Sequence, residues 1–159
     1  MIRVGLISDT HGLLRPEALA FLRGSDAIIH AGDIGNAGIL EQLSVLAPVT
    51  AVRGNNDIDG WAGALNESER LQFGQVGIQV IHDLARMRTD PAVAGVQVVI
   101  AGHSHKPAIV EKNGVKYVNP GSAGPRRFRL PVSIGELRID GASAVARLVQ
   151  LACGDAATR

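Results

Sequence analysis

Short apolar runs alternate with polar, glycine-containing loops along the first third of the chain. Runs of Ile, Val, Leu and Ala predict three buried strands, over residues 3–8, 27–31 and 49–52. Helical spacing of apolar residues predicts a helix over 16–22, with Pro16 in its first turn, and another from Ile39 up to Pro48. Strands that alternate with helices through short connections are typical of right-handed crossovers, so this part predicts a parallel sheet.

The second half of the chain has a different pattern, dominated by hairpins. Paired apolar runs predict hairpin strands over 71–73 with 76–81, 108–112 with 115–119, and 133–139 with 143–151. The predicted turns are Gly74-Gln75, Asn113-Gly114 and Asp140-Gly141. A short helix is predicted from Asp90-Pro91 to Gly95, followed by a strand over 97–101. A parallel half followed by an antiparallel half predicts an α/β (α+β) chain with two sheets packed face to face.

Composition restricts the class of protein. The chain has 159 residues, 46% of them hydrophobic, which argues against disorder and predicts one domain over 1–151 with a loose tail over 152–159. A formal net charge of +1 gives no reason to expect nucleic-acid or membrane binding. The single cysteine, Cys153, can supply neither a disulfide nor a thiolate metal site. Because the N-terminus has no signal-peptide pattern and no apolar run reaches about 18 residues, we expect a cytoplasmic protein.

Side chains with metal-ligand chemistry follow five of the predicted strands. They are Asp9 and His11, Asp33, Asn55 to Asp57, His82, and His103 with His105. Ligands bind beyond the carboxyl ends of parallel strands, so these side chains are expected to converge. Mixed imidazole, carboxylate and amide groups suit Mn²⁺, Fe, Co²⁺, Ni²⁺ or Zn²⁺, and seven of them exceed what one four-coordinate ion needs. Two ions are the simplest fit, and the fifth histidine, His30, is expected in the core or behind the ligands.

Taken in order, these motifs resemble those of the calcineurin-like metallophosphoesterase family, and most closely its small, single-domain prokaryotic phosphodiesterase branch. The motifs are Asp9-Thr10-His11, Gly32-Asp33, Gly54-Asn55-x-Asp57, His82, Gly102-His103-Ser104-His105 and Asn119-Pro120-Gly121-Ser122. The resemblance runs from residue 1 to about residue 150. It implies a four-layer αββα sandwich, in which two mixed sheets are flanked by helices.

The resemblance also implies a ligand set. One metal ion would be held by Asp9, His11, Asp33 and His105. The other would be held by Asp33, Asn55, His82 and His103, with Asp33 bridging the two. The implied cofactors are two divalent ions, with Mn²⁺ favoured over Ni²⁺, Zn²⁺, Fe or Co²⁺. The implied reaction is hydrolysis of a phosphate ester, a diester rather than a monoester, by in-line attack of a water that bridges the metals.

Five further positions could act beside the ligands. Asp57 is expected either to orient a neighbouring ligand or water, or to serve only as a turn residue. Asn56 replaces the histidine that is common in the family; it can donate a hydrogen bond to phosphate but cannot act as a general acid. Asp83 replaces a common glycine after His82 and is expected to add a carboxylate near the site. Arg126 and Arg127 either bind a substrate phosphate or form a solvated basic loop.

Two other functions stay open. The retromer subunit that shares this fold uses it as a protein-binding scaffold with an impaired metal site, so the fold alone does not establish catalysis. The presence of all seven expected ligands favours a hydrolase that acts on a small phosphodiester. A nuclease of the same superfamily is disfavoured by the near-neutral charge, because binding to a nucleic-acid backbone needs clustered Lys and Arg. The oligomeric state is left open, a homo-oligomer included.

Overall fold

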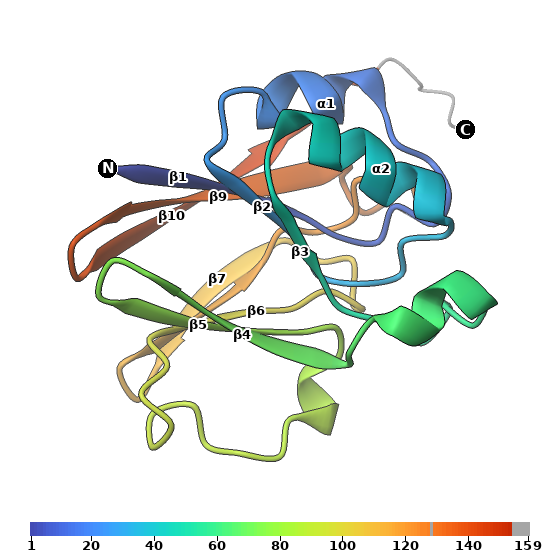
Figure 1. The fold of residues 1–159 in the computed structure, drawn as a ribbon. Helices are drawn as coiled ribbons and strands as arrows, with labels where there is room; N and C mark the ends of the chain where they lie inside the picture. Colours follow the sequence, from blue (N-terminus) through green and yellow to red (C-terminus); the bar gives the residue numbers. More distant parts are fainter. Residues whose placement is uncertain (128, 154–159) are drawn as a thin grey trace.

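A computed structural model describes residues 1–127 and 129–153, which form two five-stranded sheets stacked face to face (Figure 1). The first sheet has the order β10-β9-β1-β2-β3 and the second β4-β5-β6-β8-β7. The strands of the first sheet are β1 (Ile2–Ile7), β2 (Ala27–His30), β3 (Val49–Ala51), β9 (Ser133–Asp140) and β10 (Ser143–Gln150). Those of the second are β4 (Ser68–Phe73), β5 (Val76–Ile81), β6 (Val98–Ile100), β7 (Ala108–Lys112) and β8 (Val115–Asn119).

Apolar side chains fill the space between the sheets and cover both outer faces. Val4, Leu6, Ile78 and Val80 are among the residues buried between the sheets. Helices α1 (Pro16–Leu22) and α2 (Ala37–Leu46) pack on the outer face of the first sheet (Figure 1). The outer face of the second sheet is covered by a segment that contains only a short 3₁₀ helix, η2 (Leu84–Arg86) (Figure 1).

The arrangement confirms the predicted fold class, a sandwich of two mixed sheets. In the first sheet β1, β2 and β3 are parallel, with Val4 opposite Ala27 and Ile28 opposite Val49. In the second sheet β5, β6 and β8 are parallel, and the hairpin strands complete both sheets in antiparallel fashion. The helical layer over the second sheet is thinner than the family fold implies, because η2 is its only helix in the described residues.

The predicted strands, hairpins and two α-helices lie within a few residues of their expected positions. The helix predicted over residues 90–95 was wrong. Asp90 does cap this segment, since its Oδ1 accepts a hydrogen bond from the Ala92 N–H. Gly95 then turns to a left-handed φ of 79°, and the chain enters the core at Val96 before a second turn can form.

The structure contains two short helices that the sequence did not predict, and it leaves most of the predicted tail outside the described residues. The 3₁₀ helices η1 (Gly60–Ala64) and η2 were not expected from the sequence. Most of the predicted tail, residues 154–159, lies outside the described residues. Within the described chain, none of the helices has the length and apolar character needed to span a membrane.

Candidate metal centre

The loops that follow β1, β2, β3, β5 and β6 meet at one end of the sandwich. Backbone hydrogen bonds hold them together: Asp9 N donates to Gly32 O at 3.0 Å, and His11 N donates to Asp33 O at 2.9 Å. The two sheets are joined at the same place, where the His82 ring contacts Ala31 O at 2.7 Å. The predicted ligands therefore converge because the parallel strands of both sheets end here.

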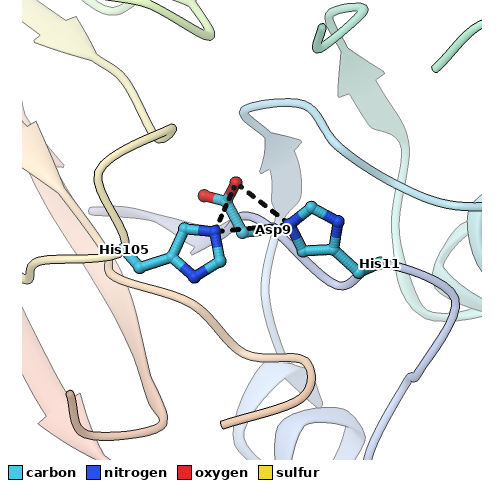
Figure 2. Close-up of side chains that lie close together, drawn as sticks. All are labelled: Asp9, His11 and His105. Atoms are coloured by element: carbon cyan, nitrogen blue, oxygen red, sulfur yellow. Dashed lines mark hydrogen bonds and ion pairs between the residues drawn. The ribbon is translucent and has the colours of Figure 1, made fainter. Parts of the chain in front are cut away.

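Asp9, His11 and His105 form a first group of potential ligands (Figure 2). The Nε2 atoms of His11 and His105 are 3.3 Å apart, and they lie 3.7 Å and 3.4 Å from Asp9 Oδ1. Figure 2 shows both rings pointing toward that carboxylate oxygen. Two ring nitrogens and a carboxylate oxygen aimed at one point form a donor set suited to a divalent cation.

Asp9, Asp33 and His82 form a second group, and all three are buried. His82 Nε2 is 3.2 Å from Asp33 Oδ2 and 3.8 Å from Asp9 Oδ1. His82 Nδ1 donates to Ala31 O, so in the neutral ring Nε2 carries a lone pair and no proton. Within the described residues, Asp9 Oδ1 and His82 Nε2 are buried without a hydrogen-bond partner. Buried acceptors that face one another in this way are costly unless a proton or a metal cation lies between them.

Asn55 and His103 form the solvent-exposed side of the site. Asn55 Oδ1 lies 3.2 Å from His103 Nδ1, and the His103 ring meets the His82 ring edge-on with centroids 5.2 Å apart. Asp83 Oδ2 is 3.9 Å from His103 Nε2, so the carboxylate expected near the site from the sequence does lie there. All seven predicted ligands thus come together at this edge of the fold.

Burial and neighbouring charges shift the pKa values of several ligands. Burial lowers the pKa of His11, although Asp33 and Asp9 oppose the shift. Burial also acts to lower the pKa of His82, but its contacts with Asp33 and Asp9 outweigh this and raise the pKa. Burial would raise the pKa of Asp33, but contacts with His82 and the Asn56 backbone N–H lower it to about 2. The carboxylate is therefore ionised at neutral pH, as a metal ligand must be.

The two positions after Asn55 both support the ligand loops, although Asn56 is exposed and Asp57 is buried. The Asn56 backbone N–H donates to Asp33 Oδ1 at 2.8 Å, and its side-chain amide donates to Asp33 Oδ2 at 3.2 Å. The Asp57 carboxylate accepts hydrogen bonds from the backbone N–H groups of Ile34, Gly35 and Gly54. Asn56 therefore contacts a predicted ligand directly, whereas Asp57 fixes the backbones of two ligand loops.

His30 lies behind the ligands, as the sequence suggested. It is fully buried; its Nδ1 accepts from Gly32 N at 3.1 Å, and its Nε2 contacts Thr10 Oγ1 at 3.0 Å. Burial lowers the pKa of His30 to about 3, so the ring is neutral and its Nε2–H donates to Thr10. This hydrogen-bonded histidine ties the loop after β1 to the loop after β2.

Close backbone approaches were not anticipated from the sequence. A Cβ on Gly32 would overlap the His82 ring, one on Gly54 would overlap Asp33, and one on Gly102 would overlap Ser8 and Asp9. Each of these glycines thus lets its own loop lie directly against a ligand from another loop. Their place in the Gly-Asp, Gly-Asn and Gly-His motifs was the only sequence signal for this packing.

The basic residues near the site differ in their surroundings. Arg126 and Arg127 are exposed, and the charge of Arg127 is near enough to His11 to contribute to lowering its pKa. Arg53 is half-buried, donates to Leu65 O at 2.7 Å and lies 3.6 Å from Glu67. Of the two arginines predicted to bind substrate phosphate, Arg127 therefore has a charge that acts on a predicted metal ligand.

Comparison with known proteins gives a family match over most of the chain. The profile of the calcineurin-like phosphoesterase superfamily domain matches residues 2–141. A probable metallophosphoesterase of Methanothermobacter thermautotrophicus is 37% identical over 159 residues, covering 92% of this chain and 91% of that protein. A second, from Methanocaldococcus jannaschii, is 36% identical and covers 86% of this chain and 76% of that protein.

Solved structures with the same fold include Vps29 proteins and a phosphodiesterase. Vacuolar Protein Sorting 29 (Vps29) from Cryptosporidium parvum has a TM-score of 0.82 and 22% identity, covering 96% of this chain and 93% of that one. Vps29 from Entamoeba histolytica complexed with Zn²⁺ has a TM-score of 0.72 and 24% identity, covering 94% of this chain and 99% of that one. A novel archaeal phosphodiesterase has a TM-score of 0.71 and 21% identity, covering 93% of this chain and 100% of that one. At these identities the likeness shows the fold and leaves the activity open.

Proposed function

Because the chain belongs to the calcineurin-like phosphoesterase superfamily, we propose that it hydrolyses phosphodiesters with two divalent metal ions bound at the edge of the sandwich. One observation carries this proposal. Asp9 Oδ1 and His82 Nε2 are buried acceptors that face each other without a hydrogen-bond partner in the described residues. Leaving such groups unpaired is costly, and a bound cation removes that cost for both.

The proposed division of ligands assigns Asp9, His11, Asp33 and His105 to one ion, and Asp33, Asn55, His82 and His103 to the other. The position of Asp33 supports its bridging role. Its Oδ2 lies 3.7 Å from His11 Nε2, in the first set, and 3.2 Å from His82 Nε2, in the second. Mn²⁺ is the proposed metal, since carboxylate and amide oxygens are mixed here with imidazole nitrogens.

Divalent ions at such a site lower the pKa of bound water and neutralise charge on a phosphoryl group. The chain's own residues hold and orient the components. Asn56 positions Asp33 through two hydrogen bonds, and Asp57 fixes the loops that carry Asp33 and Asn55. Arg127, exposed near His11, is placed to attract the anionic substrate.

A second candidate function is a protein-binding scaffold, which the resemblance to Vps29 structures supports. Metal binding does not separate the two functions, because the Entamoeba histolytica Vps29 structure itself contains Zn²⁺. Turnover does separate them, since a scaffold has no need to hydrolyse a phosphate ester.

The test compares the hydrolysis of a chromogenic phosphodiester and the matching monoester by the wild type and by Asp33→Asn, each with added Mn²⁺. We expect the wild type to prefer the diester. Asp33→Asn should lose more than the roughly 10–100-fold that removal of an outer partner of a metal ligand costs. Glu41→Gln, an exposed acid-to-amide change on α2, serves as the matched control and should keep wild-type activity. Equal activity of Asp33→Asn and the wild type would refute the bridging role.

A further inference from the structure

A cavity of about 280 Å³ lies directly beside the exposed side of the metal centre. Asn55 and His82 form the part of its wall that belongs to the proposed metal site, and Asp83 extends that wall. The rest of the wall includes Arg53, Glu67 and Arg86, which the proposed function does not use. Since the cavity shares its wall with two proposed ligands, a phosphodiester bound there would direct one of its ester groups into the cavity.

We propose that this cavity, the Arg53–Glu67–Arg86 pocket, selects phosphodiesters in which one ester group is a compact, uncharged ring that carries hydroxyl or amino groups. The proposal rests on the proposed function and specifies its substrate class.

The charges of the pocket argue against an anionic occupant. Glu67 Oε2 lies 3.6 Å from an Nη atom of Arg53 and 3.7 Å from one of Arg86, so one carboxylate is shared by two guanidinium groups. Asp83 supplies a second carboxylate on the same wall. Asp57 also lines the cavity, so its wall holds three carboxylates and two guanidinium groups and has no excess positive charge to balance a second phosphate or a carboxylate on the substrate.

The same groups suit a neutral polar ligand. The side chains of Glu67 and Arg86 are 52% and 63% exposed, so they retain capacity to accept and donate hydrogen bonds to hydroxyl and amino groups. Ile58 is 84% exposed at this pocket, and Ile81 adds a buried apolar surface. A ring with a polar edge would cover the exposed isoleucine while its edge meets the charged side chains.

The size of the cavity sets the size of the group. Its volume of about 280 Å³ lies just below the roughly 300–1,000 Å³ that small-molecule sites occupy. A single nucleoside or sugar ring system therefore suits the pocket, whereas an oligonucleotide would have to extend into solvent. This agrees with the near-neutral net charge of the chain, which gives no reason to expect nucleic-acid binding.

The experiment uses three 4-nitrophenyl phosphodiesters that differ only in their second ester group: methyl, thymidine and a carboxylate-bearing alkyl group. Because the nitrophenolate leaving group is constant, differences in kcat/KM report on binding of the second group. For the wild type we expect the thymidine ester to exceed the methyl ester by at least about 10-fold in kcat/KM, mainly through KM, as one or two good contacts would give. The carboxylate ester should fall below both.

Charge-changing variants give a readout that a merely structural role would not produce. Glu67→Gln removes the carboxylate that both arginines share, so the kcat/KM of the carboxylate ester relative to the other two should rise. Arg86→Ala removes a positive charge from the cavity wall, so the kcat/KM of the carboxylate ester relative to the other two should fall. Glu69→Gln and Arg88→Ala, a half-buried and an exposed neighbour that do not line the cavity, are the matched controls and should keep the wild-type order.

Binding of free thymidine to the metal-free protein, followed by backbone amide NMR shifts, provides a second readout. We expect shifts at Ile58, Asp83 and Arg86. Turnover of all three diesters at equal kcat/KM, or preference for the carboxylate ester by the wild type, would overturn the pocket assignment and leave the proposed function intact. Absence of turnover with every diester would overturn the proposed function itself.

Discussion

Five of the predicted metal ligands adopt a backbone conformation that their residue types rarely use. Asp9, His11, Asp33, His103 and His105 have φ values between 46° and 73°, and in the described residues only Asn113 joins them among the non-glycines. Asn113 lies in a hairpin turn that requires this conformation. For the others the left-handed backbone aims side chains of adjacent loops at one point, and such strain typically gathers at functional sites.

This strain predicts that a glycine variant is more stable than an alanine variant at such a position, which reverses the usual order. In the metal-free protein, His103→Gly should be more stable than His103→Ala by roughly 1 kcal/mol, because only alanine keeps a Cβ at a left-handed φ. The control is Arg88, an exposed loop residue without a positive φ, where the alanine variant should be the more stable. Chemical denaturation of the four variants measures both differences. A His103→Ala variant as stable as His103→Gly would show that the backbone at this position is unstrained.

The sequence predicted secondary structure best where a local signal coincides with the final contact. The Asn113-Gly114 and Asp140-Gly141 turns fix their hairpins through neighbouring residues alone. The segment over 90–95 has a good N-terminal cap, but a single turn gains too few contacts to become a helix, so its local signal misled. Contacts between distant loops, such as Asp83 with His103, have no local signal because they depend on where η2 and β6 lie.

The strands β1, β9 and β10 share a charge cluster around one buried carboxylate, which also had no local signal in the sequence. The Glu136 carboxylate is 1% exposed and accepts hydrogen bonds from Arg3 at 2.6 Å and from Arg138 and Arg147 at 3.0 Å each. Burial would raise the pKa of Glu136, but these three guanidinium groups lower it to about 2. The cluster therefore ties three adjacent strands of the first sheet through one ionised carboxylate.

The lowered pKa gives a prediction with a defined pH window. The stabilisation by Glu136 should be complete above its ordinary pKa of 4.5 and should disappear as the pH falls from 4.5 toward about 2. At pH 7, Glu136→Gln should lower the free energy of unfolding by up to about 3 kcal/mol. Glu111→Gln on the exposed face of β7 is the control and should change it by less than roughly 0.5 kcal/mol. Urea unfolding at several pH values measures the difference, and a loss that stays constant down to pH 2 would contradict the role of the charge.

At the scale of the whole molecule, the candidate metal centre lies where the two sheets meet. Asp9, His11, Asp33 and Asn55 follow strands of the first sheet, whereas His82, His103 and His105 follow strands of the second. The sequence was sufficient to predict this convergence, since parallel strands end at a common edge and all the ligands follow strands. It did not predict the Arg53–Glu67–Arg86 pocket, because its residues come from three segments whose packing no motif encodes.

The central claim is that this shared edge binds two ions and uses them for hydrolysis. The most direct test is a stepwise Mn²⁺ titration of the metal-stripped protein, in which calorimetry and turnover of a chromogenic phosphodiester are followed on the same sample. We expect two equivalents to bind per chain and turnover to rise mainly with the second, since two ions together would neutralise more of the charge on the phosphoryl group than one. Two bound equivalents without turnover, or full turnover with only one, would contradict the account.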